Sequence, residues 1–332
     1  MNFIKKSFFT SLLCLLLIFT SCKAKHGDFS DKLKIVTTIF PLFEWTHNLS
    51  YSDNNTTDNK ILTLLVKNGI DLHSYQPSVA EISQISNADI FIYVGGESDY
   101  WVKDALAQAN NKNMLVLNLM DILKNNLKEE ESFIGDCEES SPDSCENDNE
   151  DEEIEYDEHV WLSVKNAKIC VKTISEALIK ADPENQDLYN RRFADYMNKL
   201  NALDLSFERD IKAMPKDTVI ICDRFPFKYL FDDYGIKYYA AFKGCSAETE
   251  ASFETVSYLS NKVSEIDAKA VLVTESSDKK LAKTIIYNSN NKFADIYVVD
   301  SLQSTSLREA FNGKTYLATM YANLTNIKKA LE

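Results

Sequence analysis

The sequence predicts an α/β fold with two lobes, each a mostly parallel sheet flanked by helices. Runs of β-branched residues alternate with segments of helical apolar spacing in both halves of the chain, which is typical of parallel sheets. Two long helix-forming segments without strand candidates separate these halves. A chain of 332 residues, 45% of them hydrophobic, also exceeds the usual size of one domain. We therefore expect two lobes joined by helices.

The N-terminal lobe is expected at residues 33–164. Its strands are expected at residues 34–38, 61–66, 89–94 and 114–117. Helical spacing is found at residues 40–45, 79–86 and 100–109. Residues 124–158, inside this lobe, hold few apolar residues and many charges, so we expect a solvated loop there.

Residues 165–214 are expected to connect the lobes as two long helices, at 166–179 and 183–214. A second alternation of strand and helix fills the C-terminal lobe, residues 215–332. Its strands are expected at residues 218–222, 237–242, 270–274 and 296–299, and its helices at residues 253–264, 279–287 and 314–330. Ligands of such sheets bind beyond the carboxyl ends of the strands, where His73, Asp223 and Glu275 are expected.

The N-terminus is typical of a secretory signal. Two lysines precede an apolar stretch, residues 8–19, that is too short to span a bilayer, and small residues then end at Cys22. This layout indicates a lipoprotein signal peptide with a lipobox at residues 1–22, a lipid on Cys22 and a tether at residues 23–32; the alternative is an ordinary signal peptide. No later segment has the apolar length to cross a bilayer. We expect an extracytoplasmic protein, lipid-anchored to the membrane at the cell surface or in the periplasm.

The acidity of the chain is local. The formal net charge is -15, but residues 129–158 alone hold 16 acids and no Lys or Arg, so the remainder is nearly neutral. Since no basic face offsets this field, nucleic acid is not an expected partner.

The cysteines leave their pairing open. In an oxidising compartment Cys137 and Cys145 could close a small loop inside the acidic segment. Cys222 and Cys245 are either a second bridge or free thiols, and Cys170 completes the set. Because the chain has no Cys-x-x-Cys pattern, a bridge or inert thiols rank above thiolate ligation of a metal.

Two of only four histidines, His73 and His159, flank the acidic run. Imidazole nitrogen suits zinc and other divalent transition ions, and carboxylates complete such a shell and also suit manganese. His47 lies on an expected amphipathic helix and His26 in the tether, so neither is expected to bind a metal. The histidine pattern therefore predicts a metal-binding protein.

Several motifs resemble one family, the solute-binding proteins of bacterial zinc and manganese ABC importers. They occur in the family's order at residues 35–42 (IVTTIFPL), 69–77 (GIDLHSYQP), 89–96 (DIFIYVGG), 159–163 (HVWLS) and 227–230 (FKYL). The resemblance runs from about residue 33 to the C-terminus and excludes the acidic loop. It implies two lobes joined by a long rigid helix, a metal cleft between them, and a monomeric receptor that delivers its ion to an ABC permease in the cytoplasmic membrane.

The resemblance also implies the metal ligands. It makes His73 and His159 the first two. The third position, a histidine or glutamate in the family, is Arg224 here, which has no lone pair to donate. Asp223 is either a substitute ligand or an ordinary turn acid. The alternative is that Arg224 orients a ligating carboxylate by hydrogen bonding to it without contacting the metal.

The fourth family position corresponds to residues 275–278, where Glu275 or Asp278 could bind the metal. Asp278 also suits a helix cap, because the helix pattern begins at the next residue, so Glu275 is the better match. Glu248 and Glu250 either face the cleft or start the next helix.

Zinc is the favoured ion and manganese the next, although two imidazoles and two carboxylates suit both. The acidic segment occupies the place where zinc members of the family often carry a histidine-rich loop. Its carboxylates would raise the local cation concentration; the alternative is a solubilising surface loop.

Two other function classes compete with a metal receptor. A zinc hydrolase would need an open coordination position and a general base, yet the chain has no His-Glu-x-x-His, nucleophile elbow or glycine-rich phosphate loop, so we expect no enzyme. The other alternative is a surface adhesin, or a receptor of the same fold that has lost its metal and binds an anion or organic ligand at Arg224.

Overall fold

Two four-stranded, wholly parallel sheets organise the chain in the computed structural model, which describes residues 32–51, 59–67, 69–130, 155–242 and 251–332. The first sheet has the order β2-β1-β3-β4. Its strands are β1 (Leu33–Thr37), β2 (Lys60–Leu64), β3 (Ile90–Tyr93) and β4 (Leu115–Asn118). In register, Val36 of β1 pairs with Thr63 of β2 and with Phe91 of β3.

The second sheet repeats the same topology, with the order β6-β5-β7-β8. Its strands are β5 (Thr218–Ile221), β6 (Lys237–Ala240), β7 (Ala270–Thr274) and β8 (Asp295–Val299). All five residues of β7 are buried, as expected for a central strand of a parallel sheet covered on both faces. We call the halves built on the first and second sheets the N-terminal and C-terminal lobes.

Helices of the N-terminal lobe follow its strands. They are α2 (Phe40–Ser50), α3 (Val79–Ser86), α4 (Trp101–Ala107) and α5 (Leu119–Ile122). Ser78 and Glu81 form a capping box that starts α3, and Pro41 lies in the first turn of α2, where its missing N–H costs no hydrogen bond. Short 3-10 turns, η2 (Leu72–Ser74), η3 (Glu97–Asp99) and η4 (Val160–Leu162), complete the loops of this lobe.

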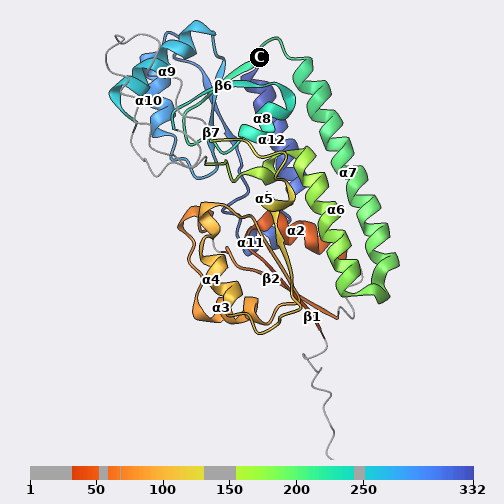
Figure 1. Ribbon diagram of the computed structural model, residues 1–332. Helices are drawn as coiled ribbons and strands as arrows, with labels where there is room; N and C mark the ends of the chain where they lie inside the picture. The colour runs from red at the N-terminus through yellow and green to blue at the C-terminus, as the bar shows by residue number, and fades with distance from the viewer. Residues whose placement is uncertain (1–31, 52–58, 68, 131–154, 243–250) are drawn as a thin grey trace, which may run out of the picture. The chain divides into compact units, whose positions relative to one another are not determined.

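Two long helices, α6 (Val164–Ala181) and α7 (Gln186–Lys212), lie side by side between the two alternating halves of the chain (Figure 1). The turn η5 (Pro183–Asn185) joins them. Ser163 caps α6 by accepting a hydrogen bond from the backbone N–H of Asn166. The prediction of two long connecting helices is confirmed, and α7 is the longer one with 27 residues.

The C-terminal lobe carries five helices among its described residues. They are α8 (Lys228–Tyr234), α9 (Phe253–Glu265), α10 (Lys280–Asn288), α11 (Leu307–Phe311) and α12 (Tyr316–Ala330). Helix α8 ends at Gly235, whose φ of 70° is the left-handed conformation that commonly terminates helices.

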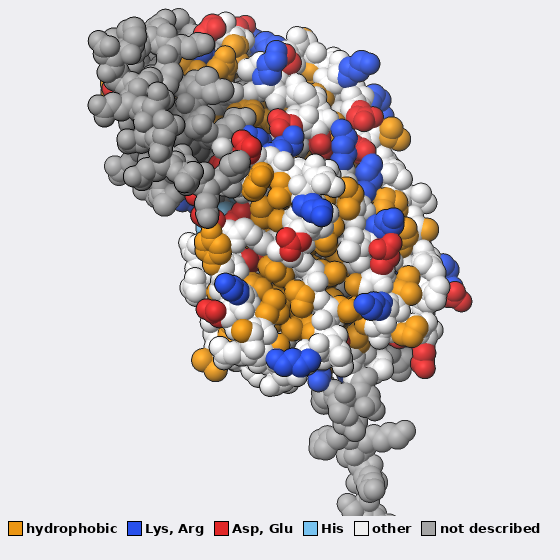
Figure 2. Space-filling view, viewed as in Figure 1, with side chains coloured by type: hydrophobic (Ala, Val, Ile, Leu, Met, Phe, Trp, Pro, Cys, Tyr) orange, Lys and Arg blue, Asp and Glu red, His pale blue; other side chains and the backbone are white. Residues whose placement is uncertain are grey.

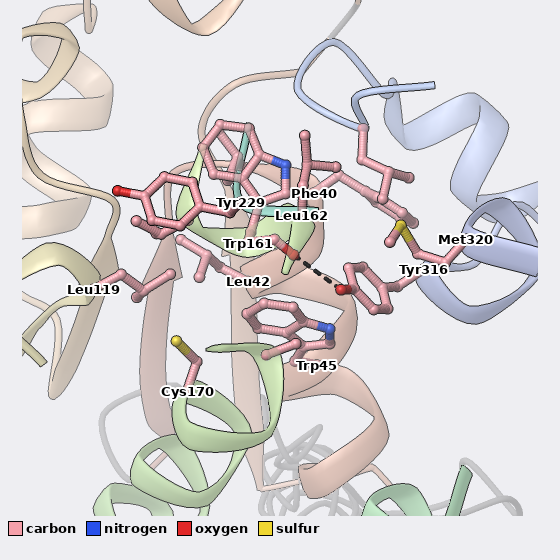
Figure 3. Packing of buried hydrophobic residues seen from close by; sticks show 14 of the residues in the cluster. Phe40, Leu42, Trp45, Leu119, Trp161, Leu162, Cys170, Tyr229, Tyr316 and Met320 are labelled. Atoms are coloured by element: carbon pink, nitrogen blue, oxygen red, sulfur yellow. Dashed lines mark hydrogen bonds between the residues drawn. The ribbon is translucent and has the colours of Figure 1, made fainter. Parts of the chain in front are cut away.

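One hydrophobic core spans both lobes. Trp45 of α2, Trp161 of η4, Tyr229 of α8 and Tyr316 of α12 are almost wholly buried in it (Figure 3). The Tyr316 hydroxyl donates a 2.9 Å hydrogen bond to the Trp161 carbonyl. A second, smaller core lies in the C-terminal lobe and includes buried residues of α9 and α10. Because the main core is shared, the lobes are packed together rather than joined only by a hinge.

These elements confirm the predicted fold class. Cys222 and Cys170 are buried free thiols, whereas Cys137, Cys145, Cys245 and Cys22, the expected site of a lipid, lie outside the described residues. On the face in Figure 2, basic and acidic side chains are interspersed among apolar ones. None of the helices in the described part of the chain is long and apolar enough to cross a bilayer.

Candidate metal centre

His73 and His159, which are 86 residues apart in sequence, meet in the structure. Their Nε2 atoms lie 3.4 Å apart. Two nitrogens on one tetrahedral zinc ion, each at about 2.0–2.1 Å from it, would be about 3.3–3.4 Å apart. The separation of the two imidazoles therefore fits a shared zinc ion.

His73 is held on the turn η2 by its neighbours. The Asp71 carboxylate caps this turn, its Oδ1 accepting a 3.0 Å hydrogen bond from the backbone N–H of His73. The ring Nδ1 lies 2.7 Å from Ser98 Oγ. When Nδ1 carries the proton it donates to Ser98, which leaves the lone pair of Nε2 facing His159.

His159 is buried, with only 3% of its side chain exposed. Asp157 Oδ1 lies 3.0 Å from the ring Nδ1 and also accepts a 2.7 Å hydrogen bond from the backbone N–H of His159. A carboxylate in this position holds the proton on Nδ1 and orients the ring, as it does behind many metal-binding histidines. Both imidazoles thus present Nε2 to the same point.

The surroundings favour neutral imidazole and a bound cation. Burial, and then the nearby ring of His159, lower the pKa of His73 to about 4, so His73 is unprotonated at neutral pH and able to ligate. Glu158 Oε2 is buried without a hydrogen-bond partner among the described residues and lies 3.8 Å from His73 Nδ1. Its other oxygen, Oε1, accepts a 2.8 Å hydrogen bond from the backbone N–H of Ser98. A carboxylate with one buried, unpaired oxygen gains from a nearby positive charge.

The predicted carboxylate ligands have other partners in this structure. Asp223, after β5, accepts hydrogen bonds of 2.9 and 3.3 Å from Oγ1 and N of Thr274, the last residue of β7. Glu275, just after β7, accepts hydrogen bonds of 2.9 and 2.7 Å from N and Oγ of Ser301. Burial, and then the proximity of Asp300, raise the pKa of Glu275.

Asp278 is exposed at the start of α10. It accepts a 2.8 Å hydrogen bond from the backbone N–H of Lys280, and the Lys280 ammonium lies 2.6 Å from its other oxygen. Asp278 thus contacts the first residue of α10, although the N-cap position is Lys279 and no side-chain capping hydrogen bond is formed there. Within the described ranges no group of three or more His, Cys, Asp and Glu side chains is arranged to hold a metal, so the structure brings together only the two histidines of the predicted set.

Arg224 pairs with a residue that the sequence analysis missed. Its Nη1 lies 3.3 Å from Asp71 Oδ2, the oxygen of the capping carboxylate that does not bond to His73. Arg224 was expected to orient a metal-binding carboxylate, and here it contacts the carboxylate that positions a candidate ligand.

Asp71 and Asp157 share a signal that could have been found in the sequence. Each lies two residues before a candidate ligand, in Asp71-Leu72-His73 and Asp157-Glu158-His159. In both cases the aspartate accepts a hydrogen bond from the backbone N–H of the histidine. The repeated Asp-x-His spacing thus marks the residues that orient the two imidazoles.

Comparisons with known proteins agree with this geometry. Residues 35–330 match the family model described as zinc-uptake complex component A, periplasmic. The high-affinity zinc uptake system protein ZnuA of Bacillus subtilis is 26% identical over 315 residues, which are 94% of this chain and 92% of that protein. The zinc-binding lipoprotein AdcA of Streptococcus pneumoniae is 27% identical over 331 residues, 99% of this chain but only 61% of AdcA.

A solved structure adds the fold. The Zn(II)-bound ZnuA-like domain of Streptococcus pneumoniae AdcA superposes with a TM-score of 0.68 at 23% identity, covering 90% of this chain and 99% of that domain. The family model covers all of both sheets except the first two residues of β1, together with the histidine pair. The chain therefore belongs to the ZnuA family of zinc-uptake binding proteins.

Proposed function

We propose that this protein is the extracytoplasmic receptor of an ABC importer, that it binds one divalent metal ion between His73 and His159, and that it delivers the ion to a membrane permease. The observation that carries the proposal is the 3.4 Å separation of the two Nε2 atoms. Ser98 and Asp157 contact the other nitrogen of each ring, which suits metal ligation. In this role the metal is cargo.

Zinc is the proposed cargo, with manganese second. Two imidazoles meet in a half-buried site. Imidazole nitrogen is a common zinc ligand, whereas magnesium, calcium and manganese are typically bound by oxygen ligands. The relatives also carry zinc in their names: ZnuA of Bacillus subtilis is a high-affinity zinc uptake protein and AdcA of Streptococcus pneumoniae a zinc-binding lipoprotein.

Glu275 is the proposed further ligand among the predicted carboxylates. It follows β7 directly and is mostly buried. Rotation of its side chain would replace its hydrogen bonds from Ser301 by a bond to a metal ion. Asp223 is the next candidate because it follows β5, the strand beside β7. Asp278 ranks last because it is exposed and paired with Lys280.

A lipid on Cys22 is the proposed anchor and a monomer the proposed state. AdcA of Streptococcus pneumoniae is described as a lipoprotein, and the Cys22 lipobox predicts the same attachment here. A receptor that captures and releases an ion needs no general base or open coordination position for water, so we propose no catalytic activity.

A chelator-competition titration of the purified chain tests the proposal, with zinc and manganese used separately and bound metal counted by mass spectrometry. We expect one tightly bound zinc per chain, lost in His73→Ala and in His159→Ala. His47→Ala is the matched control, because His47 lies on α2 and stacks on Tyr51. Equal zinc affinity in the His159→Ala and His47→Ala variants would overturn the proposal.

A further inference from the structure

The C-terminal lobe fixes the segment that carries His159 at several points. Tyr229 of α8 donates a 2.8 Å hydrogen bond to the carbonyl of Asp157. Trp161 lies two residues after His159, and its indole N–H donates a 2.8 Å hydrogen bond to the Ser301 carbonyl. The backbone carbonyl of Trp161 accepts a hydrogen bond from the Tyr316 hydroxyl. All of these contacts are buried, so this half of the metal centre is rigid.

The turn that carries His73 meets polar side chains of the C-terminal lobe at Asp71. Arg224 Nη1 lies 3.3 Å and Gln303 Nε2 3.4 Å from the same atom, Asp71 Oδ2. His73 itself is more open than His159, with 26% of its side chain exposed.

We propose that Asp71 is a positioning residue: it keeps the Nε2 atom of His73 facing that of His159 by linking the His73 turn to Arg224 and Gln303. Its Oδ1 accepts the backbone N–H of His73, and its Oδ2 faces the C-terminal lobe. The same carboxylate therefore contacts both the backbone of His73 and the C-terminal lobe. The inference rests on the proposed function and assigns a control of zinc release to this carboxylate.

Asp71 has a second effect through charge. Arg224 carries a cationic guanidinium, and it lies near enough to His73 to interact with it electrostatically. Asp71 neutralises this guanidinium; without it, Arg224 would face the bound dication as an unpaired positive charge. Loss of Asp71 thus removes the contacts of the His73 turn with Arg224 and Gln303 and leaves the Arg224 charge unpaired. Loss of Arg224 removes one of these contacts together with that charge.

The ion pair contributes little to folding, which separates its role from a structural one. The side chains of Arg224 and Asp71 are 30% and 28% exposed, and pairs with this much solvent contact add little to stability. Substitutions here should change zinc release while the unfolding of the zinc-free protein stays as in the wild type.

Stopped-flow measurement of zinc release from the zinc-loaded chain into excess chelator tests the inference. We expect release to be about tenfold faster in Asp71→Asn and about two- to fivefold faster in Arg224→Met. The double variant should release zinc more slowly than Asp71→Asn alone, because it lacks the repulsive charge. Asp217→Asn is the control, since it breaks an exposed 2.8 Å ion pair with Lys237 outside the metal centre.

Release from Asp71→Asn at the wild-type rate, or simple addition of the two single effects in the double variant, overturns the inference. If Asp71→Asn does not fold, Arg224→Met decides the question. Zinc release at the wild-type rate from Arg224→Met would contradict the claim that the contact between Asp71 and Arg224 positions His73. A failure of the proposed function is recognised separately: His159→Ala would then bind zinc as the wild type does. Wild-type zinc binding that is lost in His159→Ala, with unaltered release from Asp71→Asn, refutes only the role of Asp71.

Discussion

The hydroxyl of Tyr316 donates a 2.9 Å hydrogen bond to the carbonyl of Trp161, 155 residues earlier in the chain. This contact joins α12 of the C-terminal lobe to the turn that follows His159, and both side chains are wholly buried. The segment that carries His159 is therefore anchored in the shared core, in which Trp161 and Tyr316 lie (Figure 3).

Replacing Tyr316 by Phe tests this support. The substitution leaves a buried carbonyl without its partner, so we expect the free energy of unfolding to fall by about 1–3 kcal/mol. Urea denaturation followed by circular dichroism measures it. Tyr321→Phe on the same helix is the control, because Tyr321 is 40% exposed. Equal stability of the Tyr316→Phe and Tyr321→Phe variants would show that the contact does not support the fold.

Glu44 predicts a pH dependence of stability. Burial in α2 raises the pKa of Glu44 to about 7, against which its hydrogen bond from Tyr196 acts only in part. Between about pH 4.5 and pH 7 the folded protein keeps a proton that the unfolded chain has lost. This stabilising contribution is complete below pH 4.5 and is lost as the pH rises through about 7.

Glu44→Gln should remove this dependence, since the amide stays neutral and can still accept from Tyr196. The wild type should lose up to about 3 kcal/mol of unfolding free energy from this group over that range. Parallel urea titrations at several pH values measure the difference between the two proteins. Glu176→Gln, at an exposed position, is the control. A difference between wild type and Glu44→Gln that does not vary with pH contradicts the assignment.

A substitution at Gly96 tests whether the loop beside Glu158 and Ser98 supports zinc binding. Gly96 has a φ of 76°, and an added Cβ would meet the Glu158 carboxyl group, with Oε1 at 2.5 Å. Glu158 in turn accepts a hydrogen bond from the backbone of Ser98, the residue that contacts His73. Gly96→Ala should therefore destabilise the fold and also weaken zinc binding.

Gly235→Ala is the matched comparison, because Gly235 has a φ of 70° but nothing within 4 Å of an added Cβ. Gly235→Ala should lose about 1–2 kcal/mol of stability through its left-handed conformation. Gly96→Ala should lose about 1–3 kcal/mol, because φ 76° with ψ -164° is a region that essentially only glycine adopts. Only Gly96→Ala should lose zinc affinity, measured by chelator competition. A similar loss of affinity in both variants would mean that the Gly96 loop does not position His73.

Glu275→Gln and Asp278→Asn distinguish the proposed carboxylate ligands. Loss of a charged ligand at Glu275 should weaken zinc binding at least about tenfold, by analogy with other substitutions around metal sites. Asp278→Asn should leave the affinity unchanged, since Asp278 is exposed and paired with Lys280. Isothermal titration with zinc measures both. The reverse order of effects would assign the ligand to Asp278.

Most of the fold could be predicted from the sequence because its pattern is regular. The strand β7 was expected at the residues where it is found, and the run from 183 to 214 gave α7 with its preceding turn. Helix α8 (Lys228–Tyr234) was missed although α4, also seven residues long, was expected. The apolar residues of α8 at 229–231 form a continuous run and show no helical period.

The candidate site was predicted less completely. The histidines could be found because they are rare and occur in motifs, and the structure brings them together. The carboxylates were chosen by their position at strand ends. Their hydrogen bonds to Ser301 and Lys280, and the pairing of Arg224 with Asp71, depend on tertiary contacts that no local pattern reports.

Zinc K-edge X-ray absorption of the protein loaded with one zinc ion tests the central claim most directly, since it identifies the ligand atoms. The account predicts two imidazoles, with nitrogen at about 2.0–2.1 Å and oxygen completing the shell, and one imidazole fewer in His159→Ala. A shell without imidazole scattering, or one dominated by sulfur at about 2.3 Å, would contradict it and place the metal elsewhere in the chain.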